Sequence, residues 1–157
     1  MTDNYLCFSV DTVKLGIPLK YIDRVINAVA VCPLPNSPAT IHGLIDFYGT
    51  LVPVINLRKR LNLREIEINP DQIFVVVNTS VRKLILVADS VQGLMSMQTT
   101  DIVSAKSFDQ DLESMDIYRS DDGIILIYDT ERFLKGEVLI LPEEDIEPCL
   151  SEQSVLA

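Results

Sequence analysis

Short apolar runs bounded by turn-forming residues recur along most of the chain. Val, Ile, Leu, Phe and Tyr fill these runs, and Gly, Pro, Asn, Asp and Ser separate them, which is the pattern of β-strands. The predicted strands cover residues 5–10, 14–19, 25–31, 44–47, 51–55, 73–78, 83–88, 91–97 and 124–128. Many short strands with few helices are typical of small barrels or of a sandwich, so the pattern predicts an all-β protein.

Two short helices are also predicted, at residues 56–61 and 129–134. The second would begin at Asp129 as its N-cap and end just before Gly136, in agreement with the capping rules. Residues 99–123 between the later strands are polar and weakly periodic. A connection of that length in a compact domain is either functional or mobile.

The stretch 43–57 reads GLIDFYGTLVPVINL and predicts two strands joined by a tight turn at Tyr48-Gly49. Gly49 permits the positive φ that such a turn requires. Pro53 cannot donate a hydrogen bond to a neighbouring strand, so we expect one side of the second strand to be free there, at a sheet edge or a bulge. A free edge is a place where another protein can dock.

Composition indicates one globular domain. The chain has 157 residues, of which 48% are hydrophobic, and its mean hydropathy is +0.25, which is enough for an apolar core. The start MTDNYLCFSV lacks the pattern of a signal peptide, and no apolar run approaches the roughly 18 residues of a membrane helix. We therefore expect a cytoplasmic protein that does not insert into a membrane.

Charge argues against a nucleic-acid partner, because the formal net charge is −10 and phosphate binding depends on clustered Lys and Arg. Residues 1–65 contain seven Lys or Arg and five Asp or Glu, whereas the remainder contains six and 18. This polarity could orient the molecule against charged partners. The one basic cluster, Arg58 to Arg64, is either an amphipathic turn facing water or a docking patch for an acidic partner.

Catalytic and metal-binding patterns are weak. His42 is the only histidine, three cysteines lack C-x-x-C spacing, and no glycine-rich phosphate loop occurs. Asp89 follows the apolar run 84–88, where it is either a buried carboxylate with a raised pKa or a side chain that caps a turn. These observations predict a protein that is not an enzyme and has no cofactor.

The stretch 43–57 also resembles the signature of the CheW family of chemotaxis coupling proteins, G-x-x-N-x-R-G-x-x-x-P-V-x-D-L. The matching positions are Gly43, Gly49, Pro53, Val54 and Leu57, and the positions that differ are Asp46, Tyr48 and Asn56. Further segments in the family's order are 5–10, 17–25, 33–43, 84–93 and 123–134. The resemblance therefore extends along nearly the whole chain.

The resemblance implies a fold of two small five-stranded SH3-like β-barrels packed side by side. One CheW-like domain would cover residues 1–136, with a first lobe at about 25–85 and a second lobe built from the later strands and the N-terminal strand. Residues 137–157 contain six Asp or Glu and no Lys or Arg. We expect this acidic tail to be partly disordered.

The resemblance also implies a non-catalytic adaptor. The family couples the cytoplasmic tip of a methyl-accepting chemoreceptor to a CheA-type histidine kinase. It uses the end of one barrel to pair with the kinase's CheW-like regulatory domain and the groove between the barrels to hold the receptor. Two alternatives are a CheW-like scaffold in another chemosensory pathway, serving motility or gene regulation, and a small-ligand-binding β-barrel.

Partner-binding residues follow from the resemblance position by position. They are Ile22, Arg24, Gly43, Tyr48, Gly49, Ile73 and Ile85. The glycines could instead meet backbone demands, and the isoleucines could belong to the core. Tyr48 replaces the usual Arg and Arg24 replaces a common Glu, so we expect a changed preference among partners.

Overall fold

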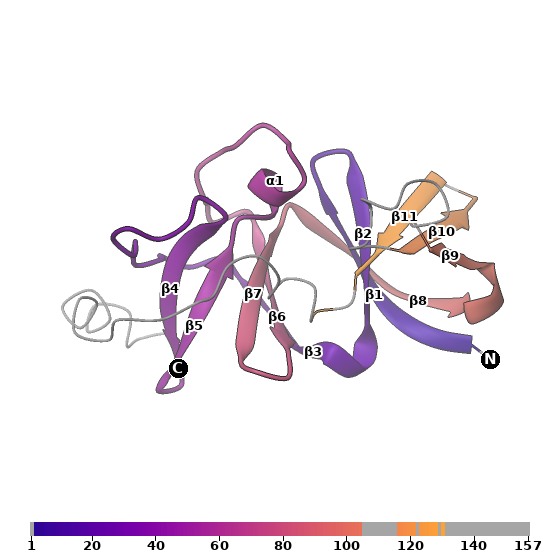
Figure 1. The fold of residues 1–157 in the computed structure, drawn as a ribbon, viewed down its shortest axis with the longest axis horizontal. Helices are drawn as coiled ribbons and strands as arrows, with labels where there is room; N and C mark the ends of the chain where they lie inside the picture. Colours follow the sequence, from indigo (N-terminus) through magenta and orange to yellow (C-terminus); the bar gives the residue numbers. More distant parts are fainter. Residues whose placement is uncertain (1, 105–115, 122, 129, 131–157) are drawn as a thin grey trace.

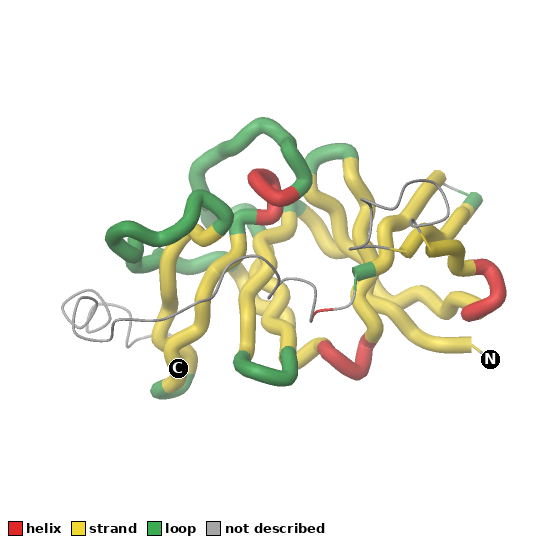
Figure 2. The backbone as a smooth tube through the Cα atoms, viewed as in Figure 1, coloured by secondary structure: helices red, strands yellow, loops and turns green. Residues whose placement is uncertain are grey.

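The computed structural model describes residues 2–104, 116–121, 123–128 and 130. Their strands form two sheets that lie side by side along the long axis of the molecule (Figure 1), with loops and short helices between strands (Figure 2). The first sheet has the order β3-β6-β7-β5-β4 and consists of β3 (Ile22–Asn27), β4 (Ile41–Phe47), β5 (Thr50–Ile55), β6 (Ile73–Asn78) and β7 (Lys83–Ala88). The all-β prediction is confirmed.

The second sheet combines both ends of the described chain. Its order is β8-β1-β2-β11-β10-β9, from β1 (Thr2–Val10), β2 (Val13–Pro18), β8 (Ser90–Gln98), β9 (Ile102–Ser104), β10 (Asp116–Ser120) and β11 (Gly123–Ile127). The early strand β2 pairs in parallel with the late strand β11, with Leu15 opposite Leu126. The chain therefore begins in the second sheet, crosses to the first and returns.

Most predicted strands are found at or near their predicted positions, and β6 and β7 match residue for residue. The strand predicted at 25–31 was misplaced, because β3 covers Ile22–Asn27. Its partner β6 begins at Ile73, opposite Asn27. After one further backbone hydrogen bond, from Ala28 to Gln72, residues 29–31 have no ladder with β6 to extend.

In its described residues, 99–104, 116–121 and 123, the polar connection predicted at 99–123 contains three elements before β11 begins. Besides β9 and β10 there is a 3-10 helix, η2 (Thr99–Asp101). Pairing with β11 stabilises β10 in spite of its weak apolar pattern, since Ile117 lies opposite Leu126 and Tyr118 lies opposite Ile125. Tertiary pairing here outweighs local composition.

The first predicted helix is confirmed in a shorter form, α1 (Leu57–Arg60). The side chain of Asn56 caps it by accepting a hydrogen bond from the backbone N–H of Lys59 at 3.2 Å. A second 3-10 helix, η1 (Leu19–Tyr21), joins β2 to β3. The predicted helix at 129–134 and the acidic tail at 137–157 lie outside the described residues apart from Thr130.

One apolar core joins the two sheets. From the second sheet it takes Leu6, Phe8, Val10, Leu15 and Ile17, and from the first it takes Ile41, Ile55, Val75, Val77, Leu84, Leu86 and Ala88. A second cluster fills the first sheet's own interior, around Phe74 and Ile85. Because both sheets contribute to the same buried cluster, neither can turn relative to the other without exposing apolar surface.

Cys7 and Cys32, the cysteines among the described residues, are both buried. Cys7 is a buried free thiol, and burial raises its pKa. Cys32 is buried and disulfide-bonded, which the odd count of cysteines did not predict. Among the described residues no group of three His, Cys, Asp or Glu is placed to hold a metal ion, and no helix is long and apolar enough to cross a membrane.

A polar network lies where the chain passes from one sheet to the other. Asp89 is the single residue between β7 and β8. Its carboxylate accepts hydrogen bonds from the Arg58 guanidinium at 2.5 Å, the Asp11 backbone N–H at 2.6 Å and the Gln72 side chain at 3.0 Å. Arg58 and Gln72 come from the first lobe and Asp11 from the β1–β2 turn, so Asp89 connects the two lobes.

The predicted raised pKa of Asp89 was wrong, and its turn-capping role is confirmed. Burial raises the pKa of this carboxyl, but the hydrogen bonds from Asp11, Gln72 and Arg58 and the charge of Arg58 together lower it below its ordinary value of 3.8. A lowered pKa means that folding favours the ionised form. The resulting stabilisation is present above about pH 3.8 and is lost as the pH falls through the lower pKa of the folded state.

We expect Asp89→Asn to lower the free energy of unfolding by about 2 kcal/mol at neutral pH, because it removes the nearer of the two counter-charges of the largely buried Arg58 and leaves only Asp11, at 3.9 Å. The difference from the wild type should shrink as the pH falls below 3.8, since the native carboxylate is then protonated as well. Urea unfolding followed by far-UV circular dichroism from pH 7 to pH 3 measures both effects.

The matched control is Asp71→Asn, in an exposed carboxylate near Gln72 in the sequence. It should change the free energy of unfolding by less than about 0.5 kcal/mol. A loss for Asp89→Asn that stays constant across this pH range would contradict the assigned network.

Candidate functional site

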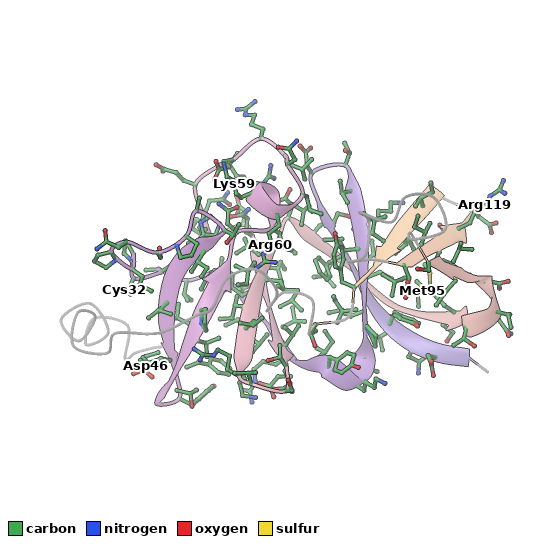
Figure 3. The ribbon with its side chains drawn as sticks, in the orientation of Figure 1. Cys32, Asp46, Lys59, Arg60, Met95 and Arg119 are labelled. Carbon is green, nitrogen blue, oxygen red and sulfur yellow. The ribbon has the colours of Figure 1, made fainter. Side chains whose placement is uncertain are left out.

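Strands β4 and β5 form a hairpin that contains the stretch 43–55, and the turn between them is exposed. Phe47 pairs with Thr50, which leaves a two-residue turn of Tyr48 and Gly49. Both residues have positive φ, 54° and 86°, as a type I′ turn requires. The backbone N–H of Gly49 donates to the Asp46 carboxylate at 2.8 Å, and Asp46 lies near the free end of the hairpin (Figure 3).

Tyr48 occupies this turn against its backbone preference. A positive φ is an outlier for a bulky residue, and Asn, Asp or Gly is the usual choice in a type I′ turn. The side chain is also 60% exposed. A bulky residue with a strained backbone and an exposed side chain does not stabilise the fold. Tyr48 is therefore a candidate for binding a partner.

The sequence predicted that one side of β5 would be unpaired at Pro53, at a sheet edge or a bulge. Pro53 is indeed outside the pairing with β7, but not because β5 is an edge strand. Strand β5 is not an edge strand, because it lies between β7 and β4. However, its parallel pairing with β7 begins at Val54, opposite Ile85. The outer half of the β4–β5 hairpin thus extends beyond β7, and a bulge between Ile41 and Gly43 interrupts the pairing of β4 with β5.

Arg24 reaches the hairpin from the opposite end of the sheet. Strands β3 and β4 are the first and last of the five-stranded order, yet the Arg24 guanidinium lies 5.1 Å from the centre of the Phe47 ring and 5.2 Å from that of Tyr48. The two rings meet edge to face at 4.7 Å. The sheet therefore closes here, with a cation against two aromatic faces.

Acidic and basic neighbours hold Arg24 in place. Its guanidinium forms an ion pair with Asp23 at 3.3 Å, and Asp23 also pairs with Lys83 at 3.5 Å. Lys83 in turn donates to the Asn78 side chain at 2.8 Å. Because the Arg24 side chain is 47% exposed, these exposed pairs contribute little stability, and their main effect is to orient the guanidinium.

The structure brings together three of the predicted site residues. We call the exposed group of Arg24, Tyr48 and Gly49 the tip surface; the buried ring of Phe47 lies beside it. The sequence analysis did not predict that the Phe47 ring would contact both Tyr48 and Arg24. The adjacent aromatics Phe47-Tyr48, next to a turn, were the available signal.

Gly43 has a structural role. A Cβ atom at this position would lie 2.1 Å from the Cys32 carbonyl oxygen, and φ is 153°. The adjacent residue Leu44 exchanges two backbone hydrogen bonds with Cys32, at 2.8 and 2.9 Å. Glycine is therefore required so that the segment around Cys32 can lie against β4.

The three isoleucines belong to the interior to different degrees. Ile22 and Ile73 are half-buried and pack against the core shared by the two sheets. Ile85 is fully buried in the first sheet's own interior. Of the two roles considered for Ile85, its position in the barrel core favours the structural one.

The basic cluster does not form one patch. Arg58 turns inward to Asp89, whereas Lys59 and Arg64 are exposed. His42, the one candidate catalytic base, is half-buried in β4. Burial lowers its pKa and the charge of Glu65 raises it by a smaller amount.

These features define the class of the protein: a double-sheet β module with a preformed, exposed aromatic tip that is suited to recognition. Residues 4–138 match the CheW-like domain, and the chain belongs to this family. A solved structure of the scaffolding protein TtCheW from Thermoanaerobacter tengcongensis is similar with a TM-score of 0.78 at 23% identity, over 90% of this chain and 94% of that one. The prediction of two SH3-like barrels side by side is confirmed, with a sixth strand in the second sheet.

Named relatives include both FrzA and CheW proteins. Protein FrzA from Myxococcus xanthus is 32% identical over 99 residues, which span 63% of this chain and 62% of FrzA. The chemotaxis protein CheW of Thermotoga maritima is 25% identical over 131 residues, 83% of this chain and 86% of that protein. The match thus spans less than two thirds of FrzA's length and most of the Thermotoga protein.

The two signature glycines should differ in their tolerance of alanine. Gly49→Ala meets no atom within 4 Å of its Cβ, so we expect only the backbone penalty of about 1 kcal/mol. Gly43→Ala would place its Cβ against the Cys32 carbonyl oxygen, and we expect it to lose about 3 kcal/mol or more. Urea unfolding of both variants measures the difference, and equal losses would contradict the structural role of Gly43.

Proposed function

We propose that this chain is a non-catalytic adaptor that acts in the cytoplasm and couples chemoreceptors to a CheA-type histidine kinase. The observation that carries the proposal is the CheW-like match across residues 4–138. The name of the Thermotoga relative, a chemotaxis protein, and the scaffolding role in the name of the structural relative support the same reading.

The rigid arrangement of the two sheets suits an adaptor. A protein that bridges two partners needs two faces at a fixed separation, and the shared core provides this without an active site. The tip surface lies at the free end of the first sheet. We propose that it contacts the kinase's CheW-like regulatory domain, while the surface between the lobes remains for the receptor.

The tip surface has the properties of an interface centre. An aromatic side chain held by a neighbouring Arg loses little conformational freedom when it binds, and Tyr and Arg are the residue types enriched at binding hot spots. Tyr48 meets both conditions, because Arg24 and Phe47 already fix its ring.

The exchanged residues favour a kinase partner that differs from the usual one. Positions 24 and 48 lie within contact distance of each other, so a Glu and an Arg there would form an ion pair. In this chain the cation has moved to position 24 and an aromatic ring has taken position 48. We propose that the tip surface selects the kinase of a diverged chemosensory array.

Tyr48→Ala should weaken binding to the CheW-like regulatory domain of the cognate CheA-type kinase by at least about tenfold, the loss of a hot-spot aromatic. Isothermal titration calorimetry with the two purified proteins measures this. Leu94→Ala is the matched control, because Leu94 is 65% exposed but lies on β8 of the second sheet. Equal effects of both variants, or none for Tyr48→Ala, would rule out the tip surface as the contact.

The double exchange Tyr48→Arg with Arg24→Glu tests selectivity. We expect it to strengthen binding to a kinase whose own coupling protein carries Arg and Glu at the two matching positions, by about tenfold for one well-placed charge pair. Each single exchange should bind more weakly than the double exchange, because it leaves one charge unpaired. Unchanged affinity in the double exchange would refute the proposed selectivity.

A further inference from the structure

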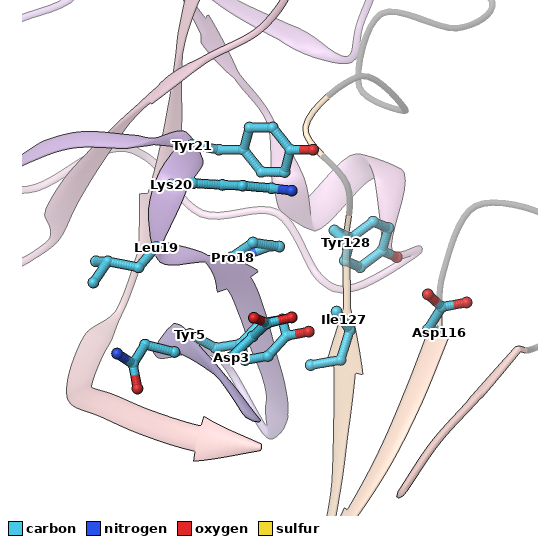
Figure 4. A pocket seen from close by; sticks show the side chains of 10 residues that line it. Asp3, Tyr5, Pro18, Leu19, Lys20, Tyr21, Asp116, Ile127 and Tyr128 are labelled. Carbon is cyan, nitrogen blue, oxygen red and sulfur yellow. The ribbon is translucent and has the colours of Figure 1, made fainter. Parts of the chain in front are cut away.

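A cavity of about 480 Å³ lies away from the tip surface, at one end of the second sheet. Strands β1, β10 and β11 form its sides, and the corner from Pro18 into η1 closes another side (Figure 4). This volume is within the range of sites that hold a small molecule or a single protruding side chain. The kinase contact proposed above does not use this cavity, which shares no residue with the tip surface.

Aromatic rings and carboxylates line the cavity together. Tyr5, Tyr21 and Tyr128 contribute rings, and Asp3 and Asp116 contribute carboxylates from β1 and β10. Figure 4 shows these side chains around one space, with Asp116 and the Tyr128 hydroxyl on the same side. Aromatic faces and carboxylates both attract a cation, and the rings also accept an alkyl stem.

Tyr5 adds a hydroxyl group to the wall of the cavity. Tyr5 is only 5% exposed and lines the cavity. Burial, followed by the charges of Asp3 and Asp116, raises its pKa, so the hydroxyl stays neutral. A hydroxyl in the wall of a cavity can donate a hydrogen bond to, or accept one from, a ligand that enters the cavity.

The charge of the lining favours one positive group. Asp3 and Asp116 carry two negative charges, and Lys20 at the rim carries one positive charge. The Lys20 ammonium lies 5.1 Å from the centre of the Tyr21 ring, which shows that this aromatic wall already accepts a cation. The remaining net negative charge is complementary to a monovalent cation.

We propose that the cavity binds an arginine side chain presented by a partner protein. A guanidinium can pair with a carboxylate through two parallel hydrogen bonds, stack on a tyrosine ring and donate to a hydroxyl oxygen at the same time. An ammonium cannot stack in this way. Asp116 is the carboxylate that would receive the guanidinium, and Tyr5 Oη would accept the additional hydrogen bond.

This inference does not rest on the tip surface. The cavity belongs to the second sheet and η1, whereas the tip surface belongs to β3, β4 and β5. A variant that empties one site leaves the other intact. Failure of arginine binding and failure of kinase binding are therefore separate results.

The test uses the full chain and two tripeptides, N-acetyl-Gly-Arg-Gly-amide and its uncharged citrulline counterpart. Titration followed by ¹⁵N–¹H NMR should give saturable shifts for the arginine peptide at residues of β1, η1 and β11, and at least about tenfold weaker binding of the citrulline peptide. Methylguanidinium, which lacks a peptide backbone, separates a free small cation from a presented side chain. The arginine peptide should bind more tightly than methylguanidinium.

Variants assign the contacts. Asp116→Asn should weaken binding of the arginine peptide by about tenfold. Asp121→Asn, at an exposed position, should leave the affinity for the peptide unchanged. Tyr5→Phe keeps the ring and removes only the hydroxyl, so it should preserve the midpoint of urea unfolding while it weakens binding of the arginine peptide by about threefold. A hydroxyl with a purely structural role would give the opposite pattern, a lower midpoint and unchanged binding.

Three results would overturn the proposal. Equal binding of the arginine and citrulline peptides would show that charge has no role. Unchanged affinity in Asp116→Asn would place any binding elsewhere. Tighter binding of methylguanidinium than of the arginine peptide would make the cavity a site for a free small cation instead of a protein side chain.

Discussion

One apolar core that two sheets share is the constraint on which this structure depends. Leu6, Phe8 and Leu15 enter it from the second sheet, and Val75 and Leu86 enter it from the first. Since β7 continues into β8 with only Asp89 between them, the polar groups that link the lobes must lie at the edge of that core. Asp89 is stabilised there by Arg58, whose side chain is only 12% exposed, so the ion pair is sheltered from solvent and fixes the join.

The curvature and register of the first sheet build the tip surface. The five-stranded order leaves β3 and β4 at its ends, and the sheet curves until Arg24 meets Phe47 and Tyr48. The strained turn at Tyr48 persists because the register of β4 and β5 over-determines it, from Ile41 opposite Ile55 to Phe47 opposite Thr50. The same strand register that builds the core therefore holds the exposed Tyr48 at a positive φ, which bulky residues disfavour.

The apolar pattern predicted most of the fold, because strands that are buried on both faces read as continuous runs of Val, Ile and Leu, as β6 and β7 do. It could not predict β10, whose residues DIYRS depend on pairing with β11. At the site, the signature located Tyr48 and Gly49, and the resemblance located Arg24. Their contact was not predictable from separation along the chain, because barrel closure alone brings β3 to β4. The burial of Ile85 likewise depends on which face of β7 points inward.

The contact between positions 24 and 48 changes the meaning of the two departures from the family pattern. Considered separately, a lost Arg and a Glu replaced by Arg are two unfavourable changes at one surface. In contact they are one exchange, in which the cation moves from the turn to the neighbouring strand and keeps a partner in the aromatic ring of Tyr48. A Glu–Arg pair would be neutral, whereas Tyr48 with Arg24 carries one positive charge, which Asp23 offsets at 3.3 Å. The tip surface thus keeps its charge balance but presents an aromatic ring where the family pattern has a guanidinium, and under the proposed function its partner would supply an apolar or aromatic contact there instead of a carboxylate.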